Sequence, residues 1–143
     1  KYTTDEKRIY DKLKAHLHQH ESKISFYLYA CSKELQKRFE NDFYHGITIT
    51  APGFFGPQGR SVRAPLAYPG LNDCLAKFHY EDQKILNFEM ETSAIYGLSK
   101  LLGHHAITVD LVLANRATGV ASINYSDRME ELAVKVLDIA ITL

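Results

Sequence analysis

Two carboxylates, Glu89 and Glu91, follow directly after a short apolar run that ends at Phe88. The run predicts a strand over residues 85–88, and helical periodicity begins just after it. Ligands of open α/β sheets bind beyond the carboxyl ends of the strands. A carboxylate at such a position can accept hydrogen bonds from both vicinal hydroxyls of a ribose. Met90, between the two, is either a flexible wall against a sugar or a core residue. Stabilisation of the amino end of the helix is an equally open role for both carboxylates.

A second candidate group, Gln58 and Arg60, lies in a glycine- and proline-rich segment over 53–70 that predicts a long loop. An amide next to a guanidinium fork suits the polar edge of a uracil-like ring. Phe54 and Phe55, just upstream, are either stacking partners for a base or core residues. Residue types alone leave open that Gln58 and Arg60 are simply solvated.

A third polar pair, Asn115 and Arg116, follows the nearly continuous apolar run 106–114, which predicts a strand buried on both faces of a parallel sheet. Alternating β-branched residues over 46–51 predict a further strand upstream. Polar groups therefore follow three predicted strands. If the strands are parallel, all three groups lie at one edge of the sheet, and we expect them to converge there.

The elements that position these residues are predicted from caps and periodicity. Thr3 and Glu6 form a capping-box pattern that predicts a helix over roughly 4–19, and a second helix is predicted over 31–41. The apolar stripe after residue 89 predicts a helix that ends at Gly103, and a long amphipathic helix is predicted behind Ser126. Strands alternating with helices predict an α/β fold in a single domain over residues 1–143.

Composition excludes several classes of function. The chain has 143 residues with 45% hydrophobic content, which suits one globular domain. Lys and Arg together number 17, as do Asp and Glu, so the net charge is zero, and nucleic acid is not an expected partner. The longest apolar run is interrupted by Asp110 and is too short to span a bilayer, so no membrane association is expected.

The cysteines and histidines predict neither a disulfide nor a metal site. Cys31 and Cys74 are too far apart in sequence for a redox or zinc motif, so we expect free thiols and a cytoplasmic protein. His18 alternates with two further histidines, of which only His16 and His20 share a helix face, and no cysteine or carboxylate motif supports them. The start at a residue other than methionine suggests part of a longer polypeptide.

Three segments resemble the nucleoside phosphorylase family, and most closely its uridine phosphorylase branch. They are GITITAPGFFGPQGR, NFEMETSAIYGLSKLLG and DLVLANRATG. The resemblance covers most of the chain from about residue 46 to the last residue. It implies a three-layer α/β/α phosphorylase/hydrolase-like fold, of which this chain would be the C-terminal half.

The resemblance also implies a role for each candidate residue. The base contacts it implies are Phe54, Gln58, Arg60, Leu113, Ala114, Asn115 and Arg116, and the ribose contacts are Glu89, Met90 and Glu91. Glu91, Arg60 and Gln58 would act in catalysis. Related bacterial purine enzymes carry an aspartate where Asn115 stands, and asparagine cannot protonate a departing purine, so a pyrimidine is favoured.

The implied reaction is reversible phosphorolysis of uridine or a related pyrimidine nucleoside to the free base and ribose 1-phosphate. Phosphate would be the co-substrate, with no metal or organic cofactor, and the implied assembly is a homo-oligomer, either a dimer or a hexamer of dimers. The family builds its phosphate site largely from an N-terminal half that has no counterpart here. Two alternatives therefore stay open: a truncated, non-catalytic nucleoside-binding or assembly module, and a nucleosidase that uses water.

Overall fold

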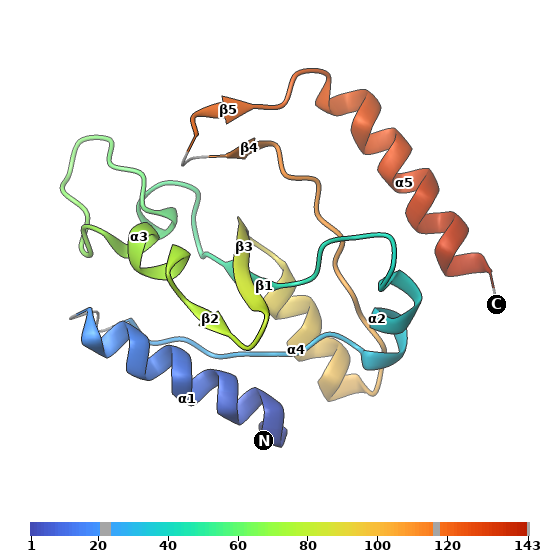
Figure 1. Cartoon of the computed structure of the whole chain (residues 1–143), viewed down its shortest axis with the longest axis horizontal. Helices are drawn as coiled ribbons and strands as arrows, with labels where there is room; N and C mark the ends of the chain where they lie inside the picture. Colours follow the sequence, from blue (N-terminus) through green and yellow to red (C-terminus); the bar gives the residue numbers. More distant parts are fainter. Residues whose placement is uncertain (21–23, 116–117, 143) are drawn as a thin grey trace.

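The computed structural model describes residues 1–20, 24–115 and 118–142 of the chain (Figure 1). Arg116, predicted to close the base pocket, lies outside the described residues. None of the described helices is both long and apolar enough to cross a membrane.

A three-stranded sheet forms the centre of the fold, in the order β1, β3, β2. β1 (Ile47–Thr50) runs parallel to β3 (Gln83–Glu89), so that Thr50 lies opposite Glu89. β2 (His79–Tyr80) pairs antiparallel with the other side of β3. Both strands predicted around this site are confirmed, and they pair in parallel, which was the condition for polar groups at their ends to share one edge. Their carboxyl ends therefore lie side by side, as an α/β ligand site requires.

One face of this sheet is apolar and the other is polar. Ile49 of β1 packs against a core formed by Leu13, Leu17, Cys74, Leu75 and Phe78, which belong to α1, to α3 (Leu71–Ala76) and to the residue just before β2. Because strand side chains alternate between faces, Thr48 and Thr50 lie on the opposite side. The residues that can carry chemistry thus occupy the face away from the core.

The four predicted helices are present, and the caps predicted at Thr3 and Gly103 are confirmed, whereas the last helix begins after Asn124 and not at Ser126. In α1 (Thr4–Gln19) the Thr3 hydroxyl accepts a hydrogen bond from the Glu6 amide at 3.2 Å, and the Glu6 carboxylate accepts one from the Thr3 amide at 2.6 Å. α4 (Thr92–Leu102) ends at Gly103, whose φ of 74° is the left-handed conformation that glycine permits. The other two predicted helices are α2 (Lys33–Phe39) and α5 (Tyr125–Ile141).

The prediction of a third buried strand over 106–114 is wrong. Most of this run is unpaired, and β4 (Ala114–Asn115) pairs only with β5 (Val120–Ala121), away from the main sheet (Figure 1). The run contacts the sheet through side chains, as in the hydrogen bond from Asn87 to Asp110, and not through a backbone ladder with β1 or β3. The sequence also did not predict α3, β2 or the single turn η1 (Gly56–Gln58) inside the long loop.

Candidate functional site

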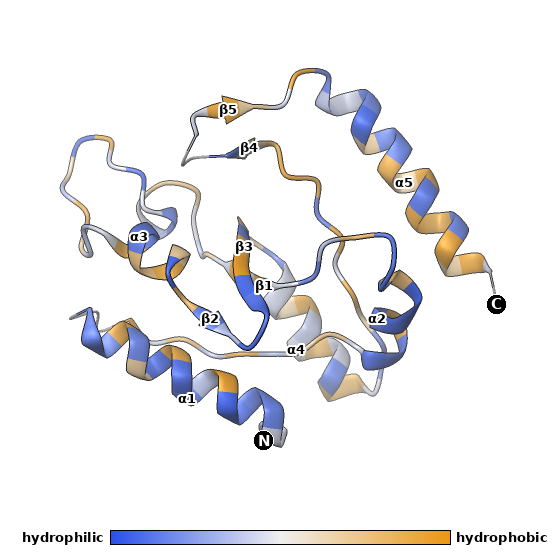
Figure 2. Cartoon of the chain, in the orientation of Figure 1, coloured by the Kyte–Doolittle hydropathy of each residue, from blue (hydrophilic) through white to orange (hydrophobic). Residues whose placement is uncertain are grey.

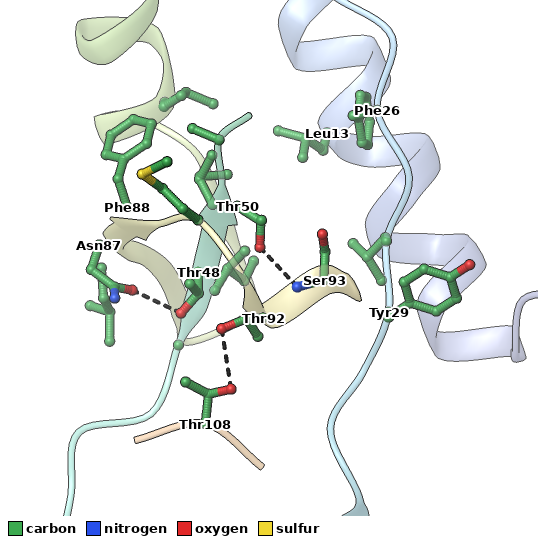
Figure 3. A pocket seen from close by; sticks show the side chains of 18 of the residues that line it. Leu13, Phe26, Tyr29, Thr48, Thr50, Asn87, Phe88, Thr92, Ser93 and Thr108 are labelled. Carbon is green, nitrogen blue, oxygen red and sulfur yellow. Dashed lines mark hydrogen bonds between the residues drawn. The ribbon is translucent and has the colours of Figure 1, made fainter. Parts of the chain in front are cut away.

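A ladder of polar side chains crosses the ends of β1 and β3 into the neighbouring segment. The Thr48 hydroxyl donates to Asn87 Oδ1 at 2.8 Å, and Asn87 Nδ2 donates to Asp110 Oδ2 at 2.8 Å. The Thr92 hydroxyl donates to the Thr108 hydroxyl at 3.1 Å (Figure 3). Although 106–113 forms no strand, its side chains therefore still reach the carboxyl edge of the sheet.

Glu89 is held in place by the start of α4. Its Oε2 accepts hydrogen bonds from the amides of Glu91 and Thr92, both at 2.6 Å, and its Oε1 accepts one from the Thr50 hydroxyl. Burial raises the pKa of Glu89, but these hydrogen bonds outweigh burial and the net pKa is lowered. The ionised carboxylate thus stabilises the helix end, and both of its oxygens already have partners.

Glu91 and Met90 lie at the same turn but are exposed. Glu91 is the N-cap residue of α4, and its side chain makes no capping bond to the helix. Its Oε2 instead accepts a hydrogen bond from the Met90 amide at 3.2 Å. Of the two carboxylates, Glu91 is therefore the more available to hydroxyl groups of a ligand.

Gln58, Arg60 and Phe54 form a compact group within the long loop. Arg60 Nη1 donates to Gln58 Oε1 at 2.6 Å and to the carbonyl of Phe54, and the guanidinium lies 3.7 Å from the centre of the Phe54 ring. Gln58 is only 4% exposed and Arg60 is partly buried against it, so these two residues are not simply solvated. A base that stacks on Phe54 must take the other face of the ring or displace the guanidinium.

The loop geometry around Gln58 depends on Gly59. Gly59 has a φ of 72°, and a Cβ at this position would lie 2.5 Å from Asn72 Nδ2. Asn72 Nδ2 in turn donates to the Gln58 carbonyl at 3.3 Å. Both the backbone conformation and the close approach of α3 therefore require glycine here.

A large open cavity of about 1570 Å³ adjoins these groups. Arg60 and Met90 are the predicted site residues that line it, and Asp110 lines it as well. Phe55, whose ring stands edge-on to Phe54 at 5.3 Å, lines the cavity, whereas Phe54 does not. Among the described residues, the other predicted positions do not line the cavity: Gln58, Glu89, Glu91, Leu113, Ala114 and Asn115.

Three predicted base-pocket residues lie apart from this cavity. Leu113 and Ala114 are exposed, and the Asn115 side chain accepts a hydrogen bond from the Thr118 amide at 3.3 Å within its own hairpin. Of the three groups expected to converge, the first contributes Arg60 and the second contributes Met90 to the cavity lining, and Asn115 of the third does not line it. The third segment contributes Asp110 and Val112 to the cavity, upstream of the residues that the resemblance indicates.

Asp110 and Asn87 line the cavity but were not among the predicted site residues. Burial raises the pKa of Asp110, as do the charges of Glu89 and Glu91, while the hydrogen bond from Asn87 lowers it, and the net pKa is raised. In the sequence, Asp110 is a lone polar residue inside the apolar run 106–114, and this was the available signal for its place at the site. The cavity thus has an acidic, hydroxyl-rich side formed by the sheet edge and a cationic, aromatic side formed by the loop.

Comparisons with known proteins give one relevant match. A uridine phosphorylase from Thermococcus kodakarensis is 34% identical to the chain over 104 residues, which are 66% of this chain and 35% of the relative. The chain therefore spans about a third of the length of that relative. No family model matches the sequence, and no solved structure matches the chain. The similarity supports a relationship to nucleoside phosphorylases.

Proposed function

We propose that this chain supplies the base- and ribose-binding part of a uridine phosphorylase-like enzyme. The observation that carries the proposal is the 34% identity with a uridine phosphorylase. The grouping of Gln58, Arg60 and an aromatic ring beside a cavity supports it. The fold in this proposal is the C-terminal half of the three-layer phosphorylase fold.

In the proposed reaction, phosphate attacks the anomeric carbon of uridine as the bond to the base breaks. Negative charge develops on the departing base, and the guanidinium of Arg60 and the amide of Gln58 stabilise it through hydrogen bonds that are already oriented. The products are free uracil and ribose 1-phosphate. No metal or organic cofactor takes part, and the phosphate site is not assigned to described residues.

The ribose is oriented in this proposal by the exposed carboxylate of Glu91, which accepts hydrogen bonds from its hydroxyl groups. Glu89 acts indirectly, because its oxygens hold the turn that presents Glu91 and Met90. The hydroxyl and amide groups of Thr48 and Asn87 offer further partners on the polar face of the sheet. Arg116, Leu113, Ala114 and Asn115 remain proposed base-pocket residues from the resemblance. The proposed assembly is a homo-oligomer.

The test is the release of uracil from uridine by the full-length protein, measured with and without phosphate. We expect release that requires phosphate and yields ribose 1-phosphate. Release at the same rate without phosphate would identify a nucleosidase instead. No release under either condition would overturn the proposed activity.

A non-catalytic nucleoside-binding module is a second candidate, favoured by the match to only about a third of the relative. Calorimetry of this chain with uridine distinguishes the two. Binding of uridine by a full-length protein that never turns it over would support the module. Phosphate-dependent turnover would exclude it.

A further inference from the structure

A histidine pair and a buried cysteine meet where α1 packs against α3, away from the cavity residues described above. His16, His20 and Cys74 each place one possible ligand atom so that all of these atoms lie within 4.8 Å of one another. His16 and His20 are one helical turn apart, with ring centres separated by 4.9 Å. The sequence showed this histidine pair without a partner, and the fold brings the thiol to it from another helix.

The protonation of His16 is set by a backbone carbonyl. His16 Nε2 lies 2.8 Å from the Cys74 carbonyl oxygen. Because a carbonyl oxygen only accepts, Nε2 carries the proton in this bond, and the lone pair of the neutral ring lies on Nδ1. Metal-binding histidines are commonly oriented by such a bond from the second ring nitrogen. The edge of His16 also packs against the Phe78 ring at 5.5 Å, which restricts its rotation further.

The third ligand is sheltered from solvent. Cys74 is 5% exposed, and burial raises the pKa of its thiol, an effect that the nearby Lys77 partly opposes. The thiol is therefore protonated at neutral pH. Metal binding would form a sulfur–metal bond, break the S–H bond and release one proton to solvent.

The spacing suits a tetrahedral ion after a small closure. Bonds of 2.0 to 2.3 Å to nitrogen and sulfur place tetrahedral ligand atoms about 3.5 Å apart. One ring nitrogen of each histidine and Cys74 Sγ lie within 4.8 Å of one another, and His20, an exposed residue at the carboxyl end of α1, can close the remaining gap by a change of rotamer. Two imidazoles and one thiolate are the ligand types that zinc and similar borderline-soft ions prefer, with the fourth position left for water.

We propose that His16, His20 and Cys74 bind a divalent transition-metal ion of the zinc type. Such an ion would link α1 to α3 and stabilise the packing of the core at Leu17, Cys74 and Phe78. It would also help to hold the loop that carries Gln58 and Arg60, because Asn72 of α3 donates a hydrogen bond to the Gln58 carbonyl. The proposed ion would join two helices, and the proposal does not depend on the proposed phosphorolysis.

The test is a titration of the metal-free chain with Zn²⁺ by calorimetry, together with Co²⁺ as a spectroscopic probe. We expect one Zn²⁺ per chain, a raised melting temperature, and a thiolate-to-cobalt charge-transfer band in the near ultraviolet. In the His20→Ala variant we expect binding weakened roughly tenfold or more, since loss of even an outer partner of a metal ligand costs that much. His20 is exposed, so this variant should fold normally.

His18→Ala is the matched control, because His18 is also exposed on α1 but lies on another face. We expect His18→Ala to bind Zn²⁺ as the unmodified chain does, and Cys74→Ser to lose the cobalt–thiolate band. The proposal would be overturned if the unmodified chain did not bind one Zn²⁺ per chain. Equal loss in His18→Ala and His20→Ala would also overturn it, because that outcome describes unspecific binding by surface histidines.

Discussion

Arg60 is the residue whose geometry most directly supports base recognition. Its guanidinium bonds Gln58, covers Phe54 and lines the cavity, so one side chain joins the buried amide to the ligand space. A lysine cannot reproduce this arrangement, because it lacks the planar fork.

We predict that Arg60→Ala weakens uridine binding about 10- to 100-fold, the range that a hydrogen bond to a charged group contributes. Arg60→Lys should restore only part of this loss. Calorimetry with uridine measures both variants. Arg128→Ala is the control, since Arg128 is an exposed arginine on α5 outside the cavity. Unchanged affinity in Arg60→Ala would contradict the base-binding role.

Asp110 carries a second prediction at the residue scale. The pKa of Asp110 is raised in the folded chain, so its ionised form lowers the free energy of unfolding at neutral pH. This destabilisation is fully present above the raised pKa and is lost as pH falls through that pKa toward the ordinary value of 3.8. Asp110→Asn keeps an acceptor oxygen for Asn87 and removes the charge that faces Glu89 and Glu91. We expect this variant to be more stable at pH 7 by no more than about 1 kcal/mol, because Asp110 is only partly buried and solvent screens its charge.

Thermal unfolding at pH 7 and pH 3 measures the effect of Asp110→Asn. The gain in melting temperature should be present at pH 7 and shrink at pH 3, where the aspartate is largely protonated. A gain of the same size at both values of pH would show that charge is not its cause.

At the scale of elements, α1 and α4 are joined by an ion pair between the buried Glu6 and the partly exposed Lys100. Glu6 is 2% exposed and accepts hydrogen bonds from Lys100 Nζ at 2.8 and 2.7 Å and from the Ala30 amide at 3.1 Å. Burial raises the pKa of Glu6, but these partners and the capping bond to Thr3 outweigh burial and lower it to about 2. One carboxylate thus caps α1 and ties it to α4.

We predict that Lys100→Met lowers the free energy of unfolding by about 3 kcal/mol, because it leaves the buried Glu6 without its counter-charge. Denaturant unfolding at pH 7 measures this change. Lys135→Met is the control: the pair between Lys135 and Asp42 is half-exposed on both sides and should contribute less than about 1 kcal/mol. Equal losses in the two variants would contradict a special role for the pair of Glu6 and Lys100.

The same ion pair has a defined pH dependence. The pKa of Glu6 is depressed on folding, so its stabilisation is present above the ordinary value of 4.5 and is lost as pH falls from 4.5 toward about 2. In Lys100→Met this acid-induced loss should be smaller. If Lys100→Met lost as much stability at acid pH as the unmodified chain, other carboxylates would be the cause of the acid sensitivity.

At the scale of the whole molecule, the chain exposes more surface than a compact protein of its size. Its accessible area is 10620 Å², whereas a folded monomer of 16.3 kDa has about 7500 Å². Much of the excess is apolar and lies on α4 and α5 (Figure 2), where no residue of α5 is buried. The large exposed side chains there are Ile95, Leu98, Leu101, Leu102, Met129, Val134, Leu137 and Ile141.

We predict that the isolated chain self-associates at micromolar concentration, because an apolar surface of this extent is rarely left in contact with water. Sedimentation velocity measures the mass, and replacing Leu98 and Leu101 with Glu should shift the chain toward monomer. Both positions are exposed, so the replacements should not disturb the core. A stable monomer that also binds no hydrophobic dye would contradict the prediction.

The sequence by itself determined the local elements. The capping box at Thr3 and Glu6, the terminal Gly103 and the alternation in β1 each depend on residues a few positions apart, and all of these predictions are confirmed. The parallel pairing of β1 and β3 was only a condition of the expected convergence, because α3 and β2, which lie between the two strands in the chain, were not predicted.

Only the tertiary structure decided which distant residues meet. His16 and Cys74 are 58 positions apart, and nothing in the spacing of either indicates the other. The apolar run 106–114 has the composition of a buried strand, but in the fold it meets the sheet through side chains such as Asp110 and forms no backbone ladder with β1 or β3. Composition reports what a segment prefers, whereas pairing and burial depend on which neighbours the rest of the chain supplies.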